Sequence, residues 1–259
     1  MKAFDVHAHL YDEKFTDIDN VIKNAKKILN GVLVAGEHPE SNRQVLALAK
    51  KYPQFCYASL GFHPTRIPDF SDKEIEDELK FIEKNSDKLI AISETGLDYM
   101  WLKRELPKDR YEKEKVRQIK YFRNYILLAK KLSLPLVVHS RWSMKDVLNV
   151  LKANKAKKVI LHAFEGTVDE VDQAVKLGYK ISIGNTINTD SMKQDVVKAI
   201  ELKHLVLETD SPVLAPVRGE RNEPANVKLT IKKIAKLKNI KEEKVIQETN
   251  KNIKELFGL

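Results

Sequence analysis

Short apolar segments alternate with longer amphipathic segments along the chain, and this alternation restricts the possible folds more than any other feature. Alternating strands and helices predict parallel strands joined by right-handed crossovers. Eight such units predict a closed (β/α)8 TIM barrel, an α/β fold of about 250 residues, and the chain has 259. The expected strands are Ala3–Val6, Gly31–Ala35, Cys56–Leu60, Leu89–Ser93, Leu134–Val138, Val159–Leu161, Lys180–Ser182 and Leu205–Leu207.

The other segments have the apolar spacing of helices. The clearest apolar stripe, at steps of three and four residues, contains Val116, Ile119, Phe122, Ile126 and Ala129. No linker rich in proline or glycine divides the chain, so we expect one domain over residues 1–259. An open doubly wound sheet is the alternative, but no G-x-G-x-x-G motif follows the first strand. The expected helices are Asp19–Leu29, Pro39–Lys51, Asp72–Asn85, Tyr111–Leu132, Ser143–Lys152, Val168–Leu177, Met192–Glu201, Pro224–Lys236 and Glu242–Phe257.

The chain carries 46 basic and 37 acidic side chains, a net charge of +9 with neutral histidines. This excess favours a partner rich in phosphate, although enrichment in Lys and Glu is also typical of hyperthermophilic proteins. The single cysteine, Cys56, excludes an intramolecular disulfide and a cysteine-built zinc site. No apolar run reaches 18 residues and no signal-peptide pattern is present, so we expect a cytoplasmic monomer without a membrane or obligate protein partner.

Potential metal ligands follow most of the expected strands. The C-terminal strand ends of a (β/α)8 barrel form its active site. Residues two apart in a strand share a face, so His7 and His9 can direct two imidazoles at one point. Five of the seven histidines stand at expected strand ends. The candidate metal ligands are His7, His9, Glu94, His139, His162 and Asp210.

Six candidate ligands exceed the needs of one open catalytic ion but suit two divalent ions. Two ions about 3.5–4 Å apart can share a hydroxide that attacks the substrate, and can stabilise the leaving oxygen. We expect Glu94 to bridge the ions, and Glu208 and Asp210 to reach the site from one strand face. These three are the expected catalytic carboxylates. Imidazole with carboxylate suits Zn, Mn, Fe or Ni better than Ca, and Mg is a further candidate.

Six motifs resemble, in order, those of the TatD family of metal-dependent deoxyribonucleases, which belongs to the amidohydrolase-like TIM barrels. They are Asp5–His9, Glu94–Asp98, His139–Arg141, His162–Gly166, Glu208–Pro212 and Arg221–Pro224, and the resemblance continues to Phe257. It implies a two-metal hydrolase acting on DNA phosphodiester bonds, with ligands that match the six candidates. It also points to removal of nucleotides from 3′ ends, and we expect single-stranded or frayed DNA as the substrate.

The resemblance implies that His63 touches the scissile phosphate, as a cation or a proton donor. The alternative is a loop histidine that bonds to the backbone. Two segments depart from the family pattern: Thr65 replaces a frequent second histidine, and Ser182–Gly184 differs from the usual seventh strand. Both border the substrate, so they put the substrate preference in question rather than the chemistry.

Two arginines are expected to bind substrate phosphate. Arg221 offers a planar fork for phosphate oxygens, or else pairs with Glu220 or Glu223. Arg141 shares a strand face with His139 and can reach the same region. The expected loop 99–110 combines Tyr99 and Trp101 with basic side chains, a mixture suited to stacking on unpaired bases.

Three functional hypotheses fit this pattern. The first is a TatD-like deoxyribonuclease. The second is an amidohydrolase-type enzyme for a small amide, lactone or phosphoester, although many such enzymes have a carbamylated lysine where this chain has Glu94. The third is a metal-stabilised binding protein without turnover, against which the complete ligand set argues.

Overall fold

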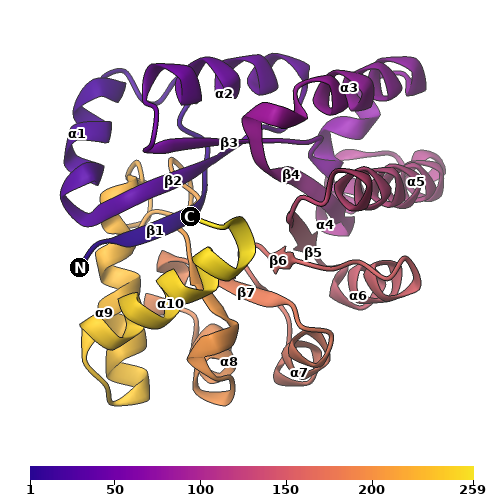
Figure 1. Ribbon diagram of the computed structural model, residues 1–259. Coiled ribbons are helices and arrows are strands. Elements are labelled where there is room, and N and C mark those ends of the chain that lie inside the picture. Colours follow the sequence, from indigo (N-terminus) through magenta and orange to yellow (C-terminus); the bar gives the residue numbers. More distant parts are fainter.

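The computed structural model describes all 259 residues and contains one eight-stranded sheet with the strands in sequence order. Each strand pairs in parallel with the next one along the chain, and the sheet curls into a barrel (Figure 1). The barrel predicted from the sequence is therefore confirmed. The strands are β1 Ala3–Ala8, β2 Leu29–Ala35, β3 Cys56–Leu60, β4 Leu89–Asp98, β5 Leu136–Arg141, β6 Val159–Leu161, β7 Lys180–Ile183 and β8 Leu205–Leu207.

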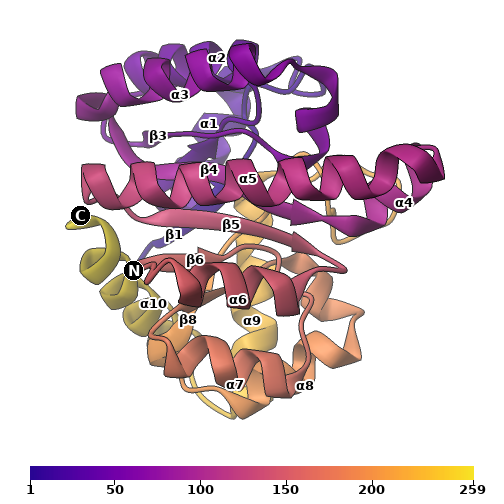
Figure 2. The same cartoon turned by 90° about the vertical axis from the view of Figure 1, so that its right-hand side faces the viewer.

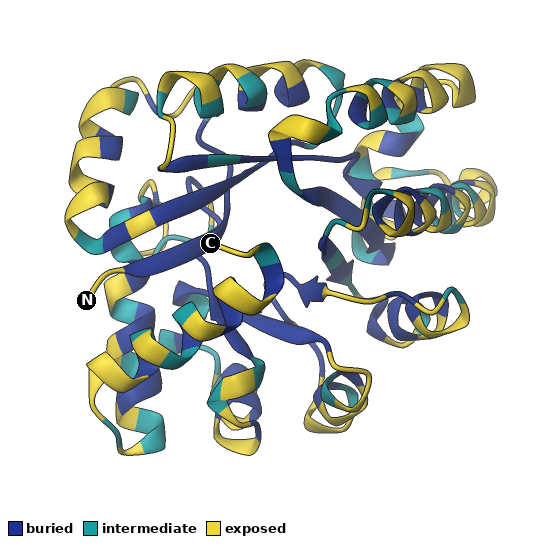
Figure 3. Cartoon of the chain, viewed as in Figure 1, coloured by how far each residue is buried: buried dark blue, intermediate teal, exposed yellow.

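Ten α-helices cover the strands, with their apolar sides inward and their exposed sides in solvent (Figure 3). Several begin at strong capping residues: Ser71 with Glu74, and Thr167 with Glu170, form reciprocal capping boxes. None of the helices has the length and apolarity needed to cross a membrane. They are α1 Ile18–Ile28, α2 Pro39–Lys51, α3 Asp72–Lys84, α4 Tyr99–Glu105, α5 Lys108–Leu132, α6 Met144–Ala153, α7 Val168–Lys176, α8 Ser191–Ala199, α9 Val227–Lys238 and α10 Glu242–Phe257.

The seam between β1 and the segment after β8 closes the barrel. The buried Asp5 carboxylate accepts hydrogen bonds from the backbone N–H and the hydroxyl of Thr209, at 3.0 and 2.5 Å. Backbone bonds continue the seam, from Asp210 N–H to the His7 carbonyl (2.9 Å) and from His9 N–H to the Ser211 carbonyl (2.7 Å). Because Asp5 has its partners, its burial leaves no unsatisfied acceptor in the wall.

Helix α10 closes the N-terminal end of the barrel (Figure 2). Its Ile253 and Leu256 pack in one apolar cluster with residues of six strands, namely Phe4, Val6, Leu33, Ala91, Val137, Ile160 and Val206. The buried Lys180 of β7 lies at the same end, where its ammonium group bonds to Glu255 of α10 at 2.8 Å. Apolar side chains therefore fill this end, which leaves the opposite end for polar chemistry.

Two expectations near α5 are wrong. The expected loop 99–110 contains α4, and Tyr99 is buried with its hydroxyl donating to Asp146 at 2.8 Å, so it is not free to stack on a base. Val116, placed in the apolar stripe, is 64 % exposed. The buried side of α5 includes Gln118, which accepts from Asp98 N–H and donates to the Pro64 carbonyl. The hydrogen bonds of Gln118 to the end of β4 and to the segment after β3, rather than apolar periodicity, set the orientation of this part of α5.

Replacing Ile253 with alanine tests whether α10 is part of the core. We expect the free energy of unfolding, measured with urea, to fall by about 2–5 kcal/mol because the change leaves a cavity at the barrel end. Leu127→Ala on α5, where the side chain is 53 % exposed, is the control and should cost less than about 0.5 kcal/mol. An equal fall in the free energy of unfolding in the two variants would contradict this role of α10.

Candidate metal centre

Histidine and carboxylate side chains from seven strands or their following loops meet at the C-terminal end of the barrel. Their ligand atoms form four overlapping groups within which all atoms lie within 4.8 Å of one another. These groups have the donor chemistry to hold metal ions. All six ligands expected from the sequence belong to them, together with two further residues, His63 and Glu37.

The buried Glu94 carboxylate of β4 is at the centre, and its two oxygens face different histidines. Oε2 lies 3.2 Å from His7 Nε2 and 3.7 Å from His9 Nε2. Oε1 lies 3.0 Å from His139 Nδ1 and 3.7 Å from His162 Nε2. One carboxylate thus stands between two pairs of imidazoles.

The backbone at Glu94 is packed against the loop after β3. A Cβ atom on Gly61 would lie 2.4 Å from both the Ser93 carbonyl carbon and the Glu94 nitrogen. Only glycine permits this approach, because any side chain would collide with the neighbouring backbone. The contact therefore fixes the position from which the Glu94 side chain extends.

Glu208 and Asp210 reach this region differently from the expectation that they share a strand face. Strand β8 ends at Leu207, and Asp210 has a left-handed backbone with φ of 57°. Its carboxylate lies 3.3 Å from His9 Nε2 and 3.8 Å from His162 Nε2. The Glu208 carboxylate instead bonds to His162 Nδ1 at 2.7 Å and to Ala163 N–H at 2.8 Å. Glu208 therefore orients His162 from behind and belongs to none of the four groups.

Three histidines have an acceptor on the ring nitrogen that faces away from Glu94 and Asp210. These acceptors are the Ala35 carbonyl for His9 Nδ1 (3.2 Å), Asp98 for His139 Nε2 (3.0 Å) and Glu208 for His162 Nδ1. An acceptor requires N–H at the outer nitrogen, so a neutral ring presents its lone pair to the centre. Metal-ligating histidines typically have this arrangement.

His63 has the opposite arrangement. Its Nδ1 accepts from the Thr65 backbone N–H at 3.3 Å, which requires a lone pair on that nitrogen. The neutral ring then carries its proton on Nε2, which lies 3.5 Å from Glu94 Oε1 and 3.2 Å from His139 Nδ1. His63 therefore presents a donor to the centre, where His9, His139 and His162 present lone pairs.

The electrostatic balance of the centre strongly favours cations. Burial would raise the pKa of its carboxyl groups, but the neighbouring imidazoles outweigh burial and lower the pKa of all five: Glu37, Glu94, Asp98, Glu208 and Asp210. Burial likewise opposes charge on the histidines, yet these carboxylates raise the pKa of His9 to about 10 and those of His139 and His162 to about 9. The five negative charges therefore attract positive charge, from protons or from metal ions.

Comparison with known proteins identifies the family of this chain. The family model described as TatD related DNase matches residues 4–258. A metal-dependent hydrolase of Bacillus subtilis is 37 % identical over 267 residues, covering 99 % of each chain. The human deoxyribonuclease TATDN3 is 37 % identical over 261 residues, covering 98 % of this chain and 93 % of its own.

The chain belongs to the TatD family.

Two further comparisons involve bacterial members of the family. The 3'-5' ssDNA/RNA exonuclease TatD of Erwinia tasmaniensis is 29 % identical over 269 residues, covering 99 % of this chain and all of its own. The crystal structure of the TatD homologue YJJV from Escherichia coli superposes with a TM-score of 0.88 at 28 % identity, covering 99 % and 98 % of the two chains. The whole TatD-family chain, rather than a segment, has its counterpart in these proteins.

Three residues that the sequence pattern did not single out contact the centre of this TatD protein or support the loop that carries Asp210. Glu37, two residues after β2, lies 3.8 Å from His9 and accepts from the Tyr11 hydroxyl at 2.6 Å. Its position just after a strand end is the signal that also marks the expected ligands, so the sequence contains the information that identifies Glu37. Asp98 was part of a recognised motif but had no assigned role. Asn222 ties the loop after β8 together by donating to the carbonyls of Thr209 and Val213.

The two arginines expected at the substrate already have protein partners in the TatD-family chain. Arg141, the last residue of β5, lies 3.4 Å from Glu165. Arg221 forms an ion pair with Glu223, donates to the Lys14 carbonyl at 2.9 Å and lies over the Phe15 ring. The alternative reading of Arg221, an ion pair with a neighbouring glutamate, thus describes its contacts, and its role at a phosphate stays a prediction.

Asp98→Asn tests the orientation of His139. The Asp98 carboxylate accepts from Trp101 N–H at 2.7 Å and from His139, and an asparagine that keeps the first bond turns its NH2 group toward the ring. An NH2 group cannot accept a hydrogen bond from Nε2–H, so the His139 proton moves to Nδ1, the nitrogen that faces Glu94. The lone pair is then lost from the centre, and we expect metal affinity to fall about 10- to 100-fold. Competition with a chromogenic chelator measures it.

The matched control is Asp17→Asn, because Asp17 also caps a helix, α1, but is exposed and belongs to none of the four ligand groups. Its metal affinity should equal that of the unchanged protein. Identical affinities in the two variants would contradict the proposed tautomer control by Asp98.

Proposed function

We propose that this TatD-family chain is a metal-dependent deoxyribonuclease that hydrolyses phosphodiester bonds with two divalent ions. The observation that supports it best is the division of Glu94 between two pairs of imidazoles, in which three of the four rings are oriented to offer lone pairs. One ion would be held by His7, His9, Glu94 and Asp210, and the other by Glu94, His139 and His162. Zn, Mn, Mg, Ni and Fe are candidates for both positions.

The charges in the centre support two ions rather than one. Its five carboxylates carry five negative charges when ionised. Two divalent ions supply four positive charges, whereas one leaves an excess of three negative charges that would repel a phosphodiester. Such ions activate water and stabilise charge on the attacking and leaving oxygens.

The chain supplies the remaining functions through its own side chains. His63 would donate its Nε2 proton in a hydrogen bond to a phosphate oxygen, in keeping with the tautomer that Thr65 selects. Arg141 and Arg221 would bind flanking phosphates by exchanging their present carboxylate partners for the substrate. Glu208 would hold His162 in its productive orientation, so its contribution is one of positioning.

The mode of action that we propose is 3′–5′ exonuclease action on single-stranded or frayed DNA. The barrel mouth is a bowl surrounded by loops, into which an intact duplex is too wide to bring its backbone, whereas a strand end can enter. The exonuclease named for the relative of Erwinia tasmaniensis supports the same mode. The second hypothesis, hydrolysis of a small amide, lactone or phosphoester, can be assayed with the same preparation.

Metal removal and two substitutions test the chemistry. Exhaustive chelation should abolish hydrolysis of labelled single-stranded DNA, and one of the candidate ions should restore it. Glu94→Gln and Asp210→Asn should each lower turnover by several orders of magnitude, because they remove charge from the ions and no core contact. Undiminished activity after confirmed metal loss would contradict the two-metal proposal.

A ladder experiment tests the mode of action. End-labelled linear DNA is incubated beside a covalently closed single-stranded circle of the same sequence. We expect stepwise shortening of the linear strand from its 3′ end while the circle stays intact, because only a free end enters the bowl. Cleavage of the circle at a comparable rate would show that the enzyme acts as an endonuclease.

A further inference from the structure

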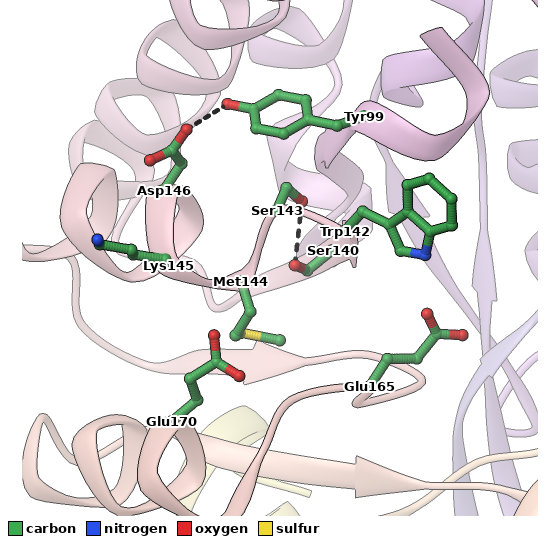
Figure 4. A pocket seen from close by; sticks show the side chains of 9 residues that line it. All are labelled: Tyr99, Ser140, Trp142, Ser143, Met144, Lys145, Asp146, Glu165 and Glu170. Carbon is green, nitrogen blue, oxygen red and sulfur yellow. Dashed lines mark hydrogen bonds between the residues drawn. The ribbon is translucent and has the colours of Figure 1, made fainter. Parts of the chain in front are cut away.

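A pocket of about 290 Å³ is formed by the end of β5 and the segments that follow β4, β5 and β6. Two of its lining residues, Tyr99 and Ser140, directly follow Asp98 and His139 in the chain, so the pocket adjoins the strand ends that carry them. Figure 4 shows Tyr99 of α4 at the top, Trp142 of the loop after β5 at the right, and Glu165 of the loop after β6 below Trp142. We propose that this pocket binds one unpaired base of the substrate strand, with Trp142 as the stacking surface. The inference rests on the proposed nuclease function and adds a subsite to it.

Trp142 has features expected of a side chain that awaits a partner. It is 60 % exposed, unusually high for an indole, which is normally well buried. Its backbone is left-handed, with φ of 55°, a strained conformation for a bulky residue and one found preferentially at ligand sites. It directly follows Arg141, so the indole is tied to the strand that carries His139.

Two cations of α4 flank the indole. Lys103 Nζ and Arg104 Cζ each lie 5.8 Å from the ring centroid, at the outer limit of a cation–π contact. A base stacked on Trp142 would bring its adjoining phosphates to the same side, where these cations can pair with them. Aromatic surfaces flanked by basic side chains are the usual means of binding single strands without strict sequence preference.

The pocket suits a base better than a phosphate. Its wall has three carboxylates, of Asp146, Glu165 and Glu170, against a single ammonium group, that of Lys145, so negative charge predominates and disfavours an anion. The same oxygens can accept hydrogen bonds from exocyclic amino groups, as carboxylates do from cytosine N4. A volume of about 290 Å³ is at the lower end for ligand pockets, which fits one ring system.

The experiment compares Trp142→Ala and Trp142→Phe on two labelled strands of oligodeoxycytidylate. One strand bears every base, and the other has consecutive abasic residues near its 3′ end. On the complete strand we expect Trp142→Ala to raise KM on the order of tenfold and Trp142→Phe to raise it less. On the abasic strand the unchanged protein and Trp142→Ala should have equal KM values, because the base that the indole would contact is missing.

Leu127→Ala, an exposed aliphatic residue of α5, is the control for loss of surface apolar area and should keep the KM of the unchanged protein on both strands. A KM for Trp142→Ala equal to that of this control on the complete strand would overturn the inference. An equal rise in KM for Trp142→Ala on the complete and abasic strands would also overturn it, because the contribution of the indole would then not depend on a base.

A binding measurement separates this inference from the nuclease proposal. A phosphorothioate strand, which resists hydrolysis, is titrated into the Trp101→Phe protein, where Trp142 is the remaining tryptophan. A base stacked on the indole should quench the fluorescence of Trp142 when the complete strand binds, whereas the abasic strand should leave the fluorescence unchanged. Quenching without any cleavage of normal DNA would refute the nuclease proposal alone, whereas cleavage without quenching would refute the base subsite alone.

Discussion

The buried negative charge of Glu94 is the constraint on which the rest of the centre depends. A carboxylate away from water is stable only when groups of opposite charge or hydrogen-bond donors surround it. The barrel meets this requirement by directing imidazoles from β1, β5 and the loops after β3 and β6 toward one side chain. The close approach of Gly61 to the backbone before Glu94 keeps that side chain in place. Any rearrangement of these strands would leave the charge without partners.

The barrel separates stability from chemistry along its axis. At the N-terminal end, Ile253 and Leu256 of α10 complete an apolar cluster inside the strands. At the C-terminal end the same strands and their following loops present carboxylates and imidazoles, with Asp5 holding the seam between the first strand and the segment after the last. Because apolar burial at one end stabilises the fold, the other end can keep an unfavourable concentration of charge.

Much of this arrangement could be predicted from the sequence because barrel topology converts chain order into place. His139 and His162 stand where short apolar runs stop, and parallel strands bring all such positions to one end. The period-2 argument was less successful for Asp210, since β8 ends earlier and a left-handed residue directs the side chain. Glu208 shows the same limit: its position behind His162 depends on loop conformation, which strand periodicity does not describe. Sequence spacing likewise could not distinguish the buried Tyr99 from the exposed Trp142, because both follow strands in segments rich in basic residues.

The closure of the seam also bears on the biosynthesis of the protein. His7 arrives with the first strand, whereas Asp210 arrives with the loop after the last, and the two are joined by the bond from Asp210 N–H to the His7 carbonyl. A nascent chain on the ribosome can form successive strand–helix units, but it lacks one side of the centre until more than four-fifths of its residues have been made. The candidate ligand set of this hydrolase is therefore complete only after the last strand and its loop have been made and joined to the first strand.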